Sequence, residues 1–382
     1  MGHRRVSVHG IWRVGVAALV GGLLLQTTAS RSWAQAVATG LWVANSAGPT
    51  VSEFSAAQVS TIGVSGPKPT LINMSGLFFS PQDTVFDSGT NLWVVDGGDG
   101  MGDMTEGVFM FTFAQLKALG TNNAPTPSFA ITNSGGVPGF VFPQFGVFDR
   151  VGNLYVADPG VNVIFVFTKN QLTSGSGTGL APAAVFQISG SVGILGLAFN
   201  KGNLYIADNG DAQIFVVNSA HIPTSGGTAT SPTVISADVT LSSNNSPTFA
   251  SIDGPWGLVF DKDGDLWFSN EGIILNSGPS VVEFAANSLT VSGTPPPTFQ
   301  ATPRILRNGG QVSIADPQGV SFDNLGDLAV SNDANESIAV FTARQLGGAG
   351  GAILPDTFLV GHDTALKAPT GLIFGPNLRP TP

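Results

Sequence analysis

The chain has 382 residues, no cysteine and a formal net charge of −10. The acidic balance argues against nucleic acid or an anionic membrane as a partner, and the lack of cysteine excludes disulfides and thiol catalysis. Only 10% of the residues are charged, while glycine and phenylalanine are abundant, which is typical of many short strands joined by tight turns.

Residues 1–36 have the features of a signal peptide. Arginines up to position 13 give a basic start, Val14–Leu25 is an apolar run, and Ala34–Ala36 offers a small-x-small cleavage site. The apolar run is short for a membrane span, so a signal peptide is favoured over an anchor. Removing four of the 15 basic residues leaves 11 against 25 acidic ones, a net charge of −14. We expect an exported protein, periplasmic or extracellular, with no membrane insertion.

One pentapeptide, of the type Leu-Trp-Val-Ala-Asn, recurs through residues 37–382. Its copies begin at Leu41, Leu92, Leu154, Leu204, Leu266 and Leu328. Each copy except the first follows an opening strand and a short turn, and each is followed by a third strand and an outer strand. Repetition at this period predicts the blades of a β-propeller with four antiparallel strands each.

The two ends of the repeat region predict how the ring closes. The first pentapeptide, at Leu41, has no opening strand before it, whereas Pro369–Phe374 is an opening strand with nothing after it. Pairing these two segments completes a sixth blade and leaves no open radial edge. The predicted fold class is therefore all-β, a single six-bladed β-propeller over residues 37–382.

Two segments resemble a known repeat family. Asp158–Phe165, with Phe148–Ala157 before it, resembles an NHL repeat, as does Asn332–Ile338, and Asp208–Phe215 is a looser match. The resemblance implies a six-bladed propeller over essentially all of residues 37–382. Similar propellers serve as protein or RNA binders, as lactonases and as lyases, so the resemblance leaves the function open.

The second residue of each opening segment, which follows a Pro in five repeats and Ile194 in the other, is expected at the mouth of the central channel. These residues are Gln82, Gln144, Leu195, Trp256, Gln318 and Thr370. Asp83 and Phe145, one residue further in, are expected beside them. Long insertions lie on the same face, and the one at residues 301–316 contains Arg304. Amide and aromatic side chains at a mouth suit a neutral polar ligand, either a glycan or a peptide segment.

The resemblance to gluconolactonase-like and streptogramin-lyase-like propellers implies an alternative, a calcium-dependent hydrolase or lyase. The lactonase-like relatives hold a metal at this mouth, and here Asp83 is the nearest carboxylate in that row. The lyase relatives need histidine, but only His221 and His362 remain after removal of residues 1–36. Binding therefore ranks above catalysis, and no cofactor is expected apart from a possible calcium ion.

Two sets of acidic residues have both a functional and a structural interpretation. The residues that end the second strands, Asp or Asn in every repeat, are expected to accept backbone N–H groups. A glycine-rich loop could wrap calcium with Asp96, Asp99, Asp103 and Glu106, although its spacing is not that of an EF-hand. A similar run, Asp261–Asp265, fits an ordinary hairpin turn on the opposite face. The sequence gives no indication of the oligomeric state.

Overall fold

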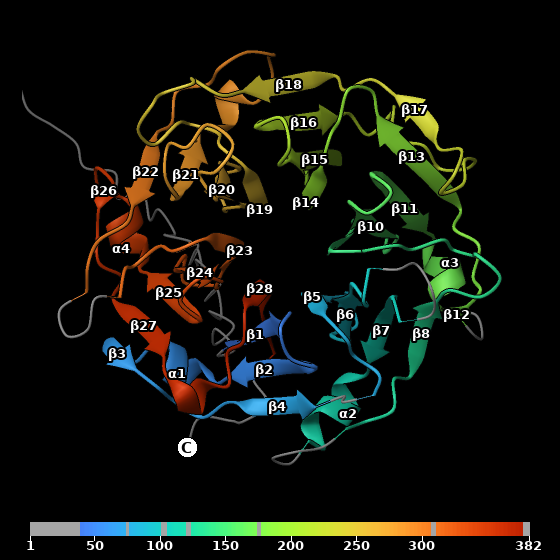
Figure 1. Ribbon diagram of the computed structural model, residues 1–382, viewed down its shortest axis with the longest axis horizontal. Helices are drawn as coiled ribbons and strands as arrows, with labels where there is room; N and C mark the ends of the chain where they lie inside the picture. The colour runs from blue at the N-terminus through green and yellow to red at the C-terminus, as the bar shows by residue number, and fades with distance from the viewer. Residues whose placement is uncertain are drawn as a thin grey trace, which may run out of the picture. The chain divides into compact units, whose positions relative to one another are not determined.

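Six small sheets stand around a central channel as the blades of a β-propeller (Figure 1). The computed structural model describes residues 39–73, 76–100, 105–119, 124–173, 177–306 and 311–376. The predicted signal peptide and Asp103 lie outside these residues. The predicted six-bladed all-β fold is confirmed.

Each blade has an antiparallel core of four strands that runs from the channel to the rim. In the order of blades 1 to 6, the inner strands are β28 (Pro369–Pro376), β5 (Pro81–Phe86), β9 (Phe145–Phe148), β14 (Ile194–Asn200), β19 (Pro255–Phe260) and β23 (Pro317–Phe322). The second strands are β1 (Thr39–Asn45), β6 (Leu92–Asp96), β10 (Leu154–Asp158), β15 (Asn203–Asp208), β20 (Leu266–Asn270) and β24 (Leu328–Asn332). The third strands are β2 (Thr50–Phe54), β7 (Gly107–Phe111), β11 (Val163–Phe167), β16 (Gln213–Val217), β21 (Ser280–Phe284) and β25 (Ser337–Phe341). The outer strands are β4 (Thr70–Asn73), β8 (Phe129–Thr132), β13 (Ala184–Ile188), β18 (Val239–Ser242), β22 (Phe299–Thr302) and β27 (Thr357–Val360).

Blade 1 is built from both ends of the described chain. β28 pairs antiparallel with β1, with Leu41 opposite Phe374 and Val43 opposite Leu372. The Trp42 indole N–H also donates to the carbonyl of Pro376 at 3.3 Å. The predicted closure by the C-terminal strand is confirmed.

The second strands are almost wholly buried, which explains why the pentapeptide is apolar at consecutive positions. A strand with one exposed face alternates, but a second strand here has a neighbouring blade on each face. The buried apolar side chains accordingly form six clusters, one at each interface between adjacent blades. Burial between the blades is therefore what holds the ring together.

Four blades carry a fifth strand that the sequence analysis did not predict. These additions are β12 (Gly177–Thr178), β17 (Thr233–Ile235), β26 (Gly351–Ala352) and β3 (Gly63–Ser65). Each comes from the following blade and pairs in parallel with the outer strand of the blade before it. Backbone hydrogen bonds thus link consecutive blades at the rim.

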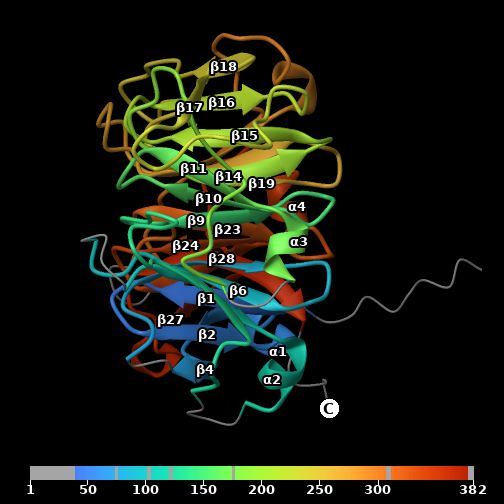
Figure 2. The same cartoon turned by 90° about the vertical axis from the view of Figure 1, so that its right-hand side faces the viewer.

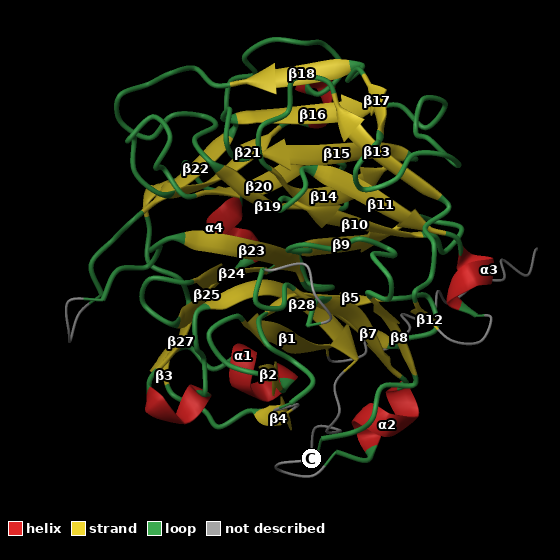
Figure 3. Ribbon diagram, turned by 45° about the vertical axis from the view of Figure 1, so that its right-hand side comes forward, coloured by secondary structure: helices red, strands yellow, loops and turns green. Residues whose placement is uncertain are grey.

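Short helices follow the third strands on one face of the ring. They are α1 (Ala56–Val59), α2 (Phe113–Lys117), α3 (Lys169–Leu172) and α4 (Ala343–Leu346), with a 3₁₀ turn, η1 (Ala286–Ser288), in the same place in blade 5. A second 3₁₀ turn, η2 (His362–Thr364), lies instead between the outer strand β27 and the inner strand β28. Seen edge-on, α1–α4 lie toward the same face, which also carries the hairpin turns between first and second strands; we name it the turn face (Figure 2). Helices are few and short beside the strands (Figure 3). None in the described part of the chain has the length and apolar character needed to cross a bilayer.

Candidate functional site

The face opposite the turn face carries the loops that lead into the inner strands and those that leave the second strands; we name it the mouth face. The Asp or Asn that ends each second strand holds one of these loops in place, because its side chain accepts hydrogen bonds from backbone N–H groups of the loop. The backbone N–H groups bound by their side chains belong to Lys367, Phe79, Val141, Val192, Asp253 and Ala315, for blades 1 to 6 in turn. The structural interpretation of these six residues is confirmed.

A glycine ring lines the channel one residue inside the mouth. Four inner strands have glycine there, at Gly196, Gly257, Gly319 and Gly371. A β-carbon at Gly196 would lie 1.9 Å from the carbonyl oxygen of Trp256, and one at Gly319 would lie 2.5 Å from that of Thr370. The inner strands therefore approach too closely for a side chain at these positions. Only two blades have another residue there, Asp83 in blade 2 and Phe145 in blade 3.

The three glutamines predicted at the mouth are buried there, but two of them bridge blades. Gln144 Nε2 lies 3.5 Å from Gln82 Oε1, and Gln82 Nε2 donates to Ser80 Oγ at 2.7 Å. This contact joins blades 3 and 2, so the side chains of Gln82 and Gln144 have a structural role between neighbouring blades. Gln318 differs, because its Oε1 is buried and has no hydrogen-bond partner among the described residues.

The two aromatic residues predicted at the mouth pack against each other. Phe145 belongs to blade 3 and Trp256 to blade 5, and their ring centroids are 6.4 Å apart in an edge-to-face arrangement. Leu195 and Leu197 of blade 4 belong to the same apolar cluster. This Phe145–Trp256 pair forms an apolar floor to the mouth, and the indole Nε1 of Trp256 is buried without a partner among the described residues.

Three carboxylates at the mouth were missed by the sequence analysis. Glu271 follows the second strand of blade 5, Asp333 follows that of blade 6, and Asp316 directly precedes Pro317. Asn209 Nδ2 of blade 4 donates to Glu271 Oε2 at 3.1 Å. The sequence analysis named Asp83 as the nearest carboxylate because it considered only the inner-strand positions and not the loop residues on either side of them.

These carboxylates interact closely and are hard to ionise together. The side chains of Glu271 and Asp316 lie close enough to affect each other's ionisation, and Gln318 acts on Asp316 in the same way. Burial, reinforced by the charges of Asp316 and Asp333, raises the pKa of Glu271 to about 7. Burial also raises the pKa of Asp316 and of Asp333 above the usual range. The group of Glu271, Asp316, Asp333 and Gln318, which we name the acceptor cluster, therefore offers several oxygen acceptors, and the pKa values of its carboxyl groups are raised.

Arg304 does not lie with the mouth residues. It follows the outer strand β22, its side chain is exposed, and its Nη1 donates to the carbonyl of Ala352 on β26 at 3.3 Å. The guanidinium therefore supports the rim contact between blades 5 and 6. Its predicted role in ligand binding at the mouth is not supported by this position.

The acidic loop of blade 2 does not fit a calcium site built around Asp96. That carboxylate is fully buried and accepts backbone N–H groups from Phe79, Ser80 and Gly98, each at 2.9 Å. Glu106 is also buried, and its Oε2 accepts from Asn133 at 3.5 Å. Asp99 is exposed on the loop and Asp103 lies outside the described residues. A hard cation needs several free oxygen ligands, which Asp96 and Glu106 are not placed to supply together.

The run at Asp261–Asp265 folds as the predicted hairpin turn on the turn face. Asp261 Oδ1 accepts from the backbone of Asp263 and Asp265, and its Oδ2 accepts from Trp267 Nε1. Among the described residues, only Asp261, Asp265 and Glu283 bring three potential metal-binding side chains together. The equivalent turn of blade 2 binds Trp93 through Asp87 in the same way, so the arrangement is a repeated structural feature.

The two histidines of the described residues each lie beside a single aspartate. His221 Nδ1 is 2.6 Å from Asp238 Oδ1 at an exposed turn that follows β16. His362 begins η2 and its side chain is fully exposed, 3.5 Å from Asp363.

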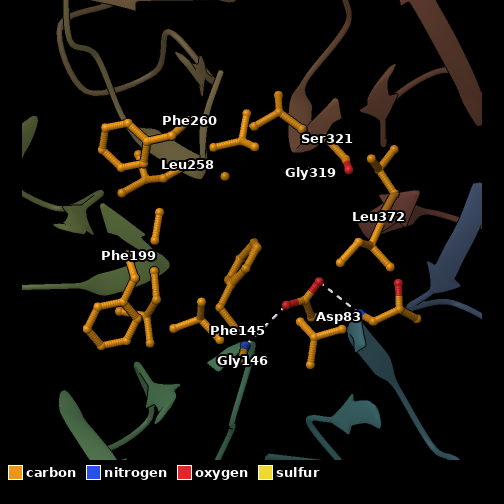
Figure 4. Close-up of a pocket in the computed structure, with 18 residues that line it drawn as sticks. Asp83, Phe145, Gly146, Phe199, Leu258, Phe260, Gly319, Ser321 and Leu372 are labelled. Atoms are coloured by element: carbon orange, nitrogen blue, oxygen red, sulfur yellow. Dashed lines mark hydrogen bonds between the residues drawn. The ribbon is translucent and has the colours of Figure 1, made fainter. Parts of the chain in front are cut away.

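Below the Phe145–Trp256 pair the channel widens into a cavity of about 310 Å³ lined by all six inner strands. Its walls are mostly apolar, including Phe199, Leu258, Phe260 and Leu372 (Figure 4). The carboxyl group of Asp83 and the ring of Phe145 point toward its middle. Asp83 therefore lies in the channel, one residue inside Gln82.

Known proteins resemble this chain only in fold. No family model matches it, and no curated protein sequence does. A nidogen/laminin complex contains a β-propeller with a TM-score of 0.52, 11% identity and coverage of 88% of this chain and 98% of that one. A putative 6-phosphogluconolactonase from Bacteroides fragilis has a TM-score of 0.50, 13% identity and the same coverages. A streptogramin B lyase has a TM-score of 0.42 and 12% identity, over 69% of this chain and 66% of its own. At these identities the likeness shows the propeller fold alone, and membership of the NHL-repeat family stays a prediction.

Proposed function

We propose that this protein is an exported ligand-binding propeller whose channel mouth recognises a neutral, hydroxyl-rich ligand, a glycan. The N-terminal segment supports export, and the acceptor cluster with its aromatic floor supports recognition. The observation that carries the proposal is Gln318 Oε1, a buried oxygen that has no hydrogen-bond partner in the part of the chain that the structure describes and that lies beside several carboxyl groups. A buried acceptor left unpaired costs about 1–3 kcal/mol, so a ligand that donates to it recovers that energy.

The chemistry of the mouth favours a ligand rich in hydrogen-bond donors. Carboxylate and amide oxygens only accept, and the hydroxyl groups of a sugar supply several donors on a rigid frame. The apolar floor formed by Phe145 and Trp256 suits the C–H face of a sugar ring, and a few convergent polar groups above an apolar surface are the usual make-up of a ligand pocket. Blades 4, 5 and 6 all contribute, so the site depends on the closed ring.

We expect a screen of the purified protein on a glycan array to give at least one ligand, and Glu271→Gln to weaken its binding about 10- to 100-fold. The substitution replaces a carboxylate acceptor with a neutral amide, and hydrogen bonds to charged groups contribute about 1.5–3 kcal/mol. Isothermal titration calorimetry measures the change. The matched control is Glu283→Gln, which removes a carboxylate on the turn side of blade 5. Equal weakening in both variants would mean that the ligand does not bind at the channel mouth. Binding to peptide arrays but not to glycan arrays would mean that the ligand is a peptide.

A second function is favoured by one observation, the raised pKa values of Glu271 and Asp316, two carboxyl groups that influence each other. Two neighbouring carboxyl groups with raised pKa values can act as an acid and a base near neutral pH. A hydrolase or lyase acting on the bound ligand would use this pair. Prolonged incubation with the array ligand, followed by mass spectrometry, decides between the two: an unchanged ligand supports binding alone, and a product that Glu271→Gln fails to form supports catalysis.

A further inference from the structure

Asp83 stands alone as an ionisable group in the channel wall. The inner strands β5, β9, β14, β19, β23 and β28 contain no other Asp, Glu, His, Lys, Arg or Tyr. In four of the six blades the equivalent residue is glycine, so the repeat itself does not require a carboxyl group there. A buried carboxylate costs desolvation energy, and an acid placed where glycine fits has a purpose beyond the fold.

The carboxyl group is held in place but lacks a counter-charge. Its Oδ1 accepts from the backbone N–H of Thr84 at 2.8 Å, and its Oδ2 accepts from that of Gly146 at 3.1 Å. These two bonds fix the group over Gly371, whose added β-carbon would lie 2.1 Å from Oδ1. Burial outweighs both bonds and raises the pKa of Asp83 to about 8. Asp83 is only 5% exposed, so a cation that pairs with it has to enter the cavity.

The surrounding walls define what kind of cation fits. The rings of Phe145, Phe199 and Phe260 line the cavity together with aliphatic side chains. A volume of about 310 Å³ is at the lower end for a small-molecule pocket. A divalent metal ion takes about six to eight oxygen ligands, and one carboxylate among apolar walls supplies too few. Aromatic rings, in contrast, attract organic cations through their faces.

The residues at the turn-face end of the cavity are more exposed than those near the mouth. Phe199 and Phe260, at the turn-face ends of their strands, are half-buried, whereas Asp83 and Phe145 are buried. A molecule that enters from the turn face would therefore pass aromatic rings before it meets the carboxyl group.

We propose that the central channel is a second binding site, distinct from the mouth, for a small organic cation with an apolar body whose ammonium group pairs with Asp83. The nearest acids on the second strands, Asp96 of β6 and Asp158 of β10, end at the mouth face and each accepts backbone N–H groups there. Tyr155 of β10 and the carboxyl of Asp149 interact with each other near the turn face. Asp83 is thus the single group that faces the cavity and can carry its charge.

Benzylamine is the probe, because it joins one aromatic ring to one ammonium group, and benzyl alcohol is its neutral counterpart. We expect the parent protein to bind benzylamine at least about tenfold more tightly than benzyl alcohol at pH 8, by NMR titration. Asp83→Asn should abolish that difference, whereas Glu271→Gln should preserve it. Since the ammonium group displaces the proton of Asp83, the affinity should rise about 50-fold between pH 6 and pH 8.

Each outcome decides the proposal independently of the mouth. Equal binding of amine and alcohol, or a preference that survives Asp83→Asn, overturns it. A preference lost in Glu271→Gln assigns the amine to the acceptor cluster and also overturns it. If Asp83→Asn does not fold, the pH series measured on the Glu271→Gln protein replaces it, and a flat series overturns the proposal. A failed glycan screen leaves this test unaffected.

Discussion

A protein that ends at residue 368 is expected not to reach the native fold. The deletion removes β28, the inner strand of blade 1, and leaves β1 with an open edge beside the channel. It also removes Leu372 from the cluster between blades 6 and 1, and Thr370 Oγ1 from the carbonyl of Pro81. Two blade interfaces lose their inner contacts at once, so the expected effect is the loss of cooperative thermal unfolding.

The matched control is a protein that ends at residue 376, which keeps β28 complete. We expect it to melt cooperatively at a temperature close to that of the full chain, as followed by circular dichroism. Cooperative melting of the shorter protein at the same temperature would mean that the ring does not depend on its C-terminal strand.

Asp83→Asn is expected to flatten the pH dependence of stability. The pKa of Asp83 rises from 3.8 to about 8 on folding, because burial disfavours its charged form. Between these two pH values the folded state binds more protons than the unfolded one, so the free energy of unfolding falls as pH rises. One such group contributes a slope of about 1.4 kcal/mol per pH unit within this window. The asparagine side chain at position 83 does not ionise, so the variant loses this contribution to the slope of the unfolding free energy against pH.

Urea unfolding at a series of pH values from 5 to 8 measures the slope. Asparagine supplies one acceptor fewer for the N–H groups of Thr84 and Gly146, which lowers stability by a constant amount and leaves the slope as the readout. Asp263→Asn, at an exposed position of the turn face, removes the same charge and should keep the parent slope. Identical slopes for the parent and Asp83→Asn would mean that Asp83 is ionised and stabilised in the folded protein.

The ring and its closure could be predicted because the buried positions of each blade require apolar residues, which recur at regular intervals along the sequence. Each second strand is buried on both faces, so every copy of the pentapeptide keeps its apolar residues, and Leu41 and Pro369 mark the two halves of blade 1. The fifth strands have no such recurring pattern of side chains. Gly177–Thr178 and Gly351–Ala352 pair through backbone atoms alone, which any sequence can supply.

The residues at the mouth were predicted only in part, because the sequence analysis aligned only the first residues of each inner strand. The loop residues before the inner strands and after the second strands were not compared. Gln318 was found after Pro317, but Asp316 precedes the same Pro, and Glu271 follows a second strand instead of opening a first one. Residues from different loops meet only once the ring closes. A search of the positions on both sides of each strand end would have found these carboxylates.

The sequence places Asp83 one residue inside the mouth position, but it does not reveal the direction of the side chain. β5 contains a bulge between Pro81 and Asp83, where the pairing with β6 shifts by one residue, and the inner strands β14, β19 and β23 have similar shifts. Such a shift changes the direction of the following side chain, and periodicity alone does not reveal it. The sequence did carry a signal, since aligning the six opening strands shows Asp83 and Phe145 as the two exceptions to glycine.

The affinity of Gln318→Leu for the array glycan tests the binding account most directly, because Gln318 Oε1 is the unpaired acceptor on which it depends. Leucine has a similar volume and leaves no new cavity, but it also removes the interaction of Gln318 with Asp316, so the variant should fold with a somewhat lower melting temperature than the parent. The account predicts at least about tenfold weaker binding in isothermal titration calorimetry. A variant that folds normally and binds the glycan as tightly as the parent would contradict recognition at the channel mouth.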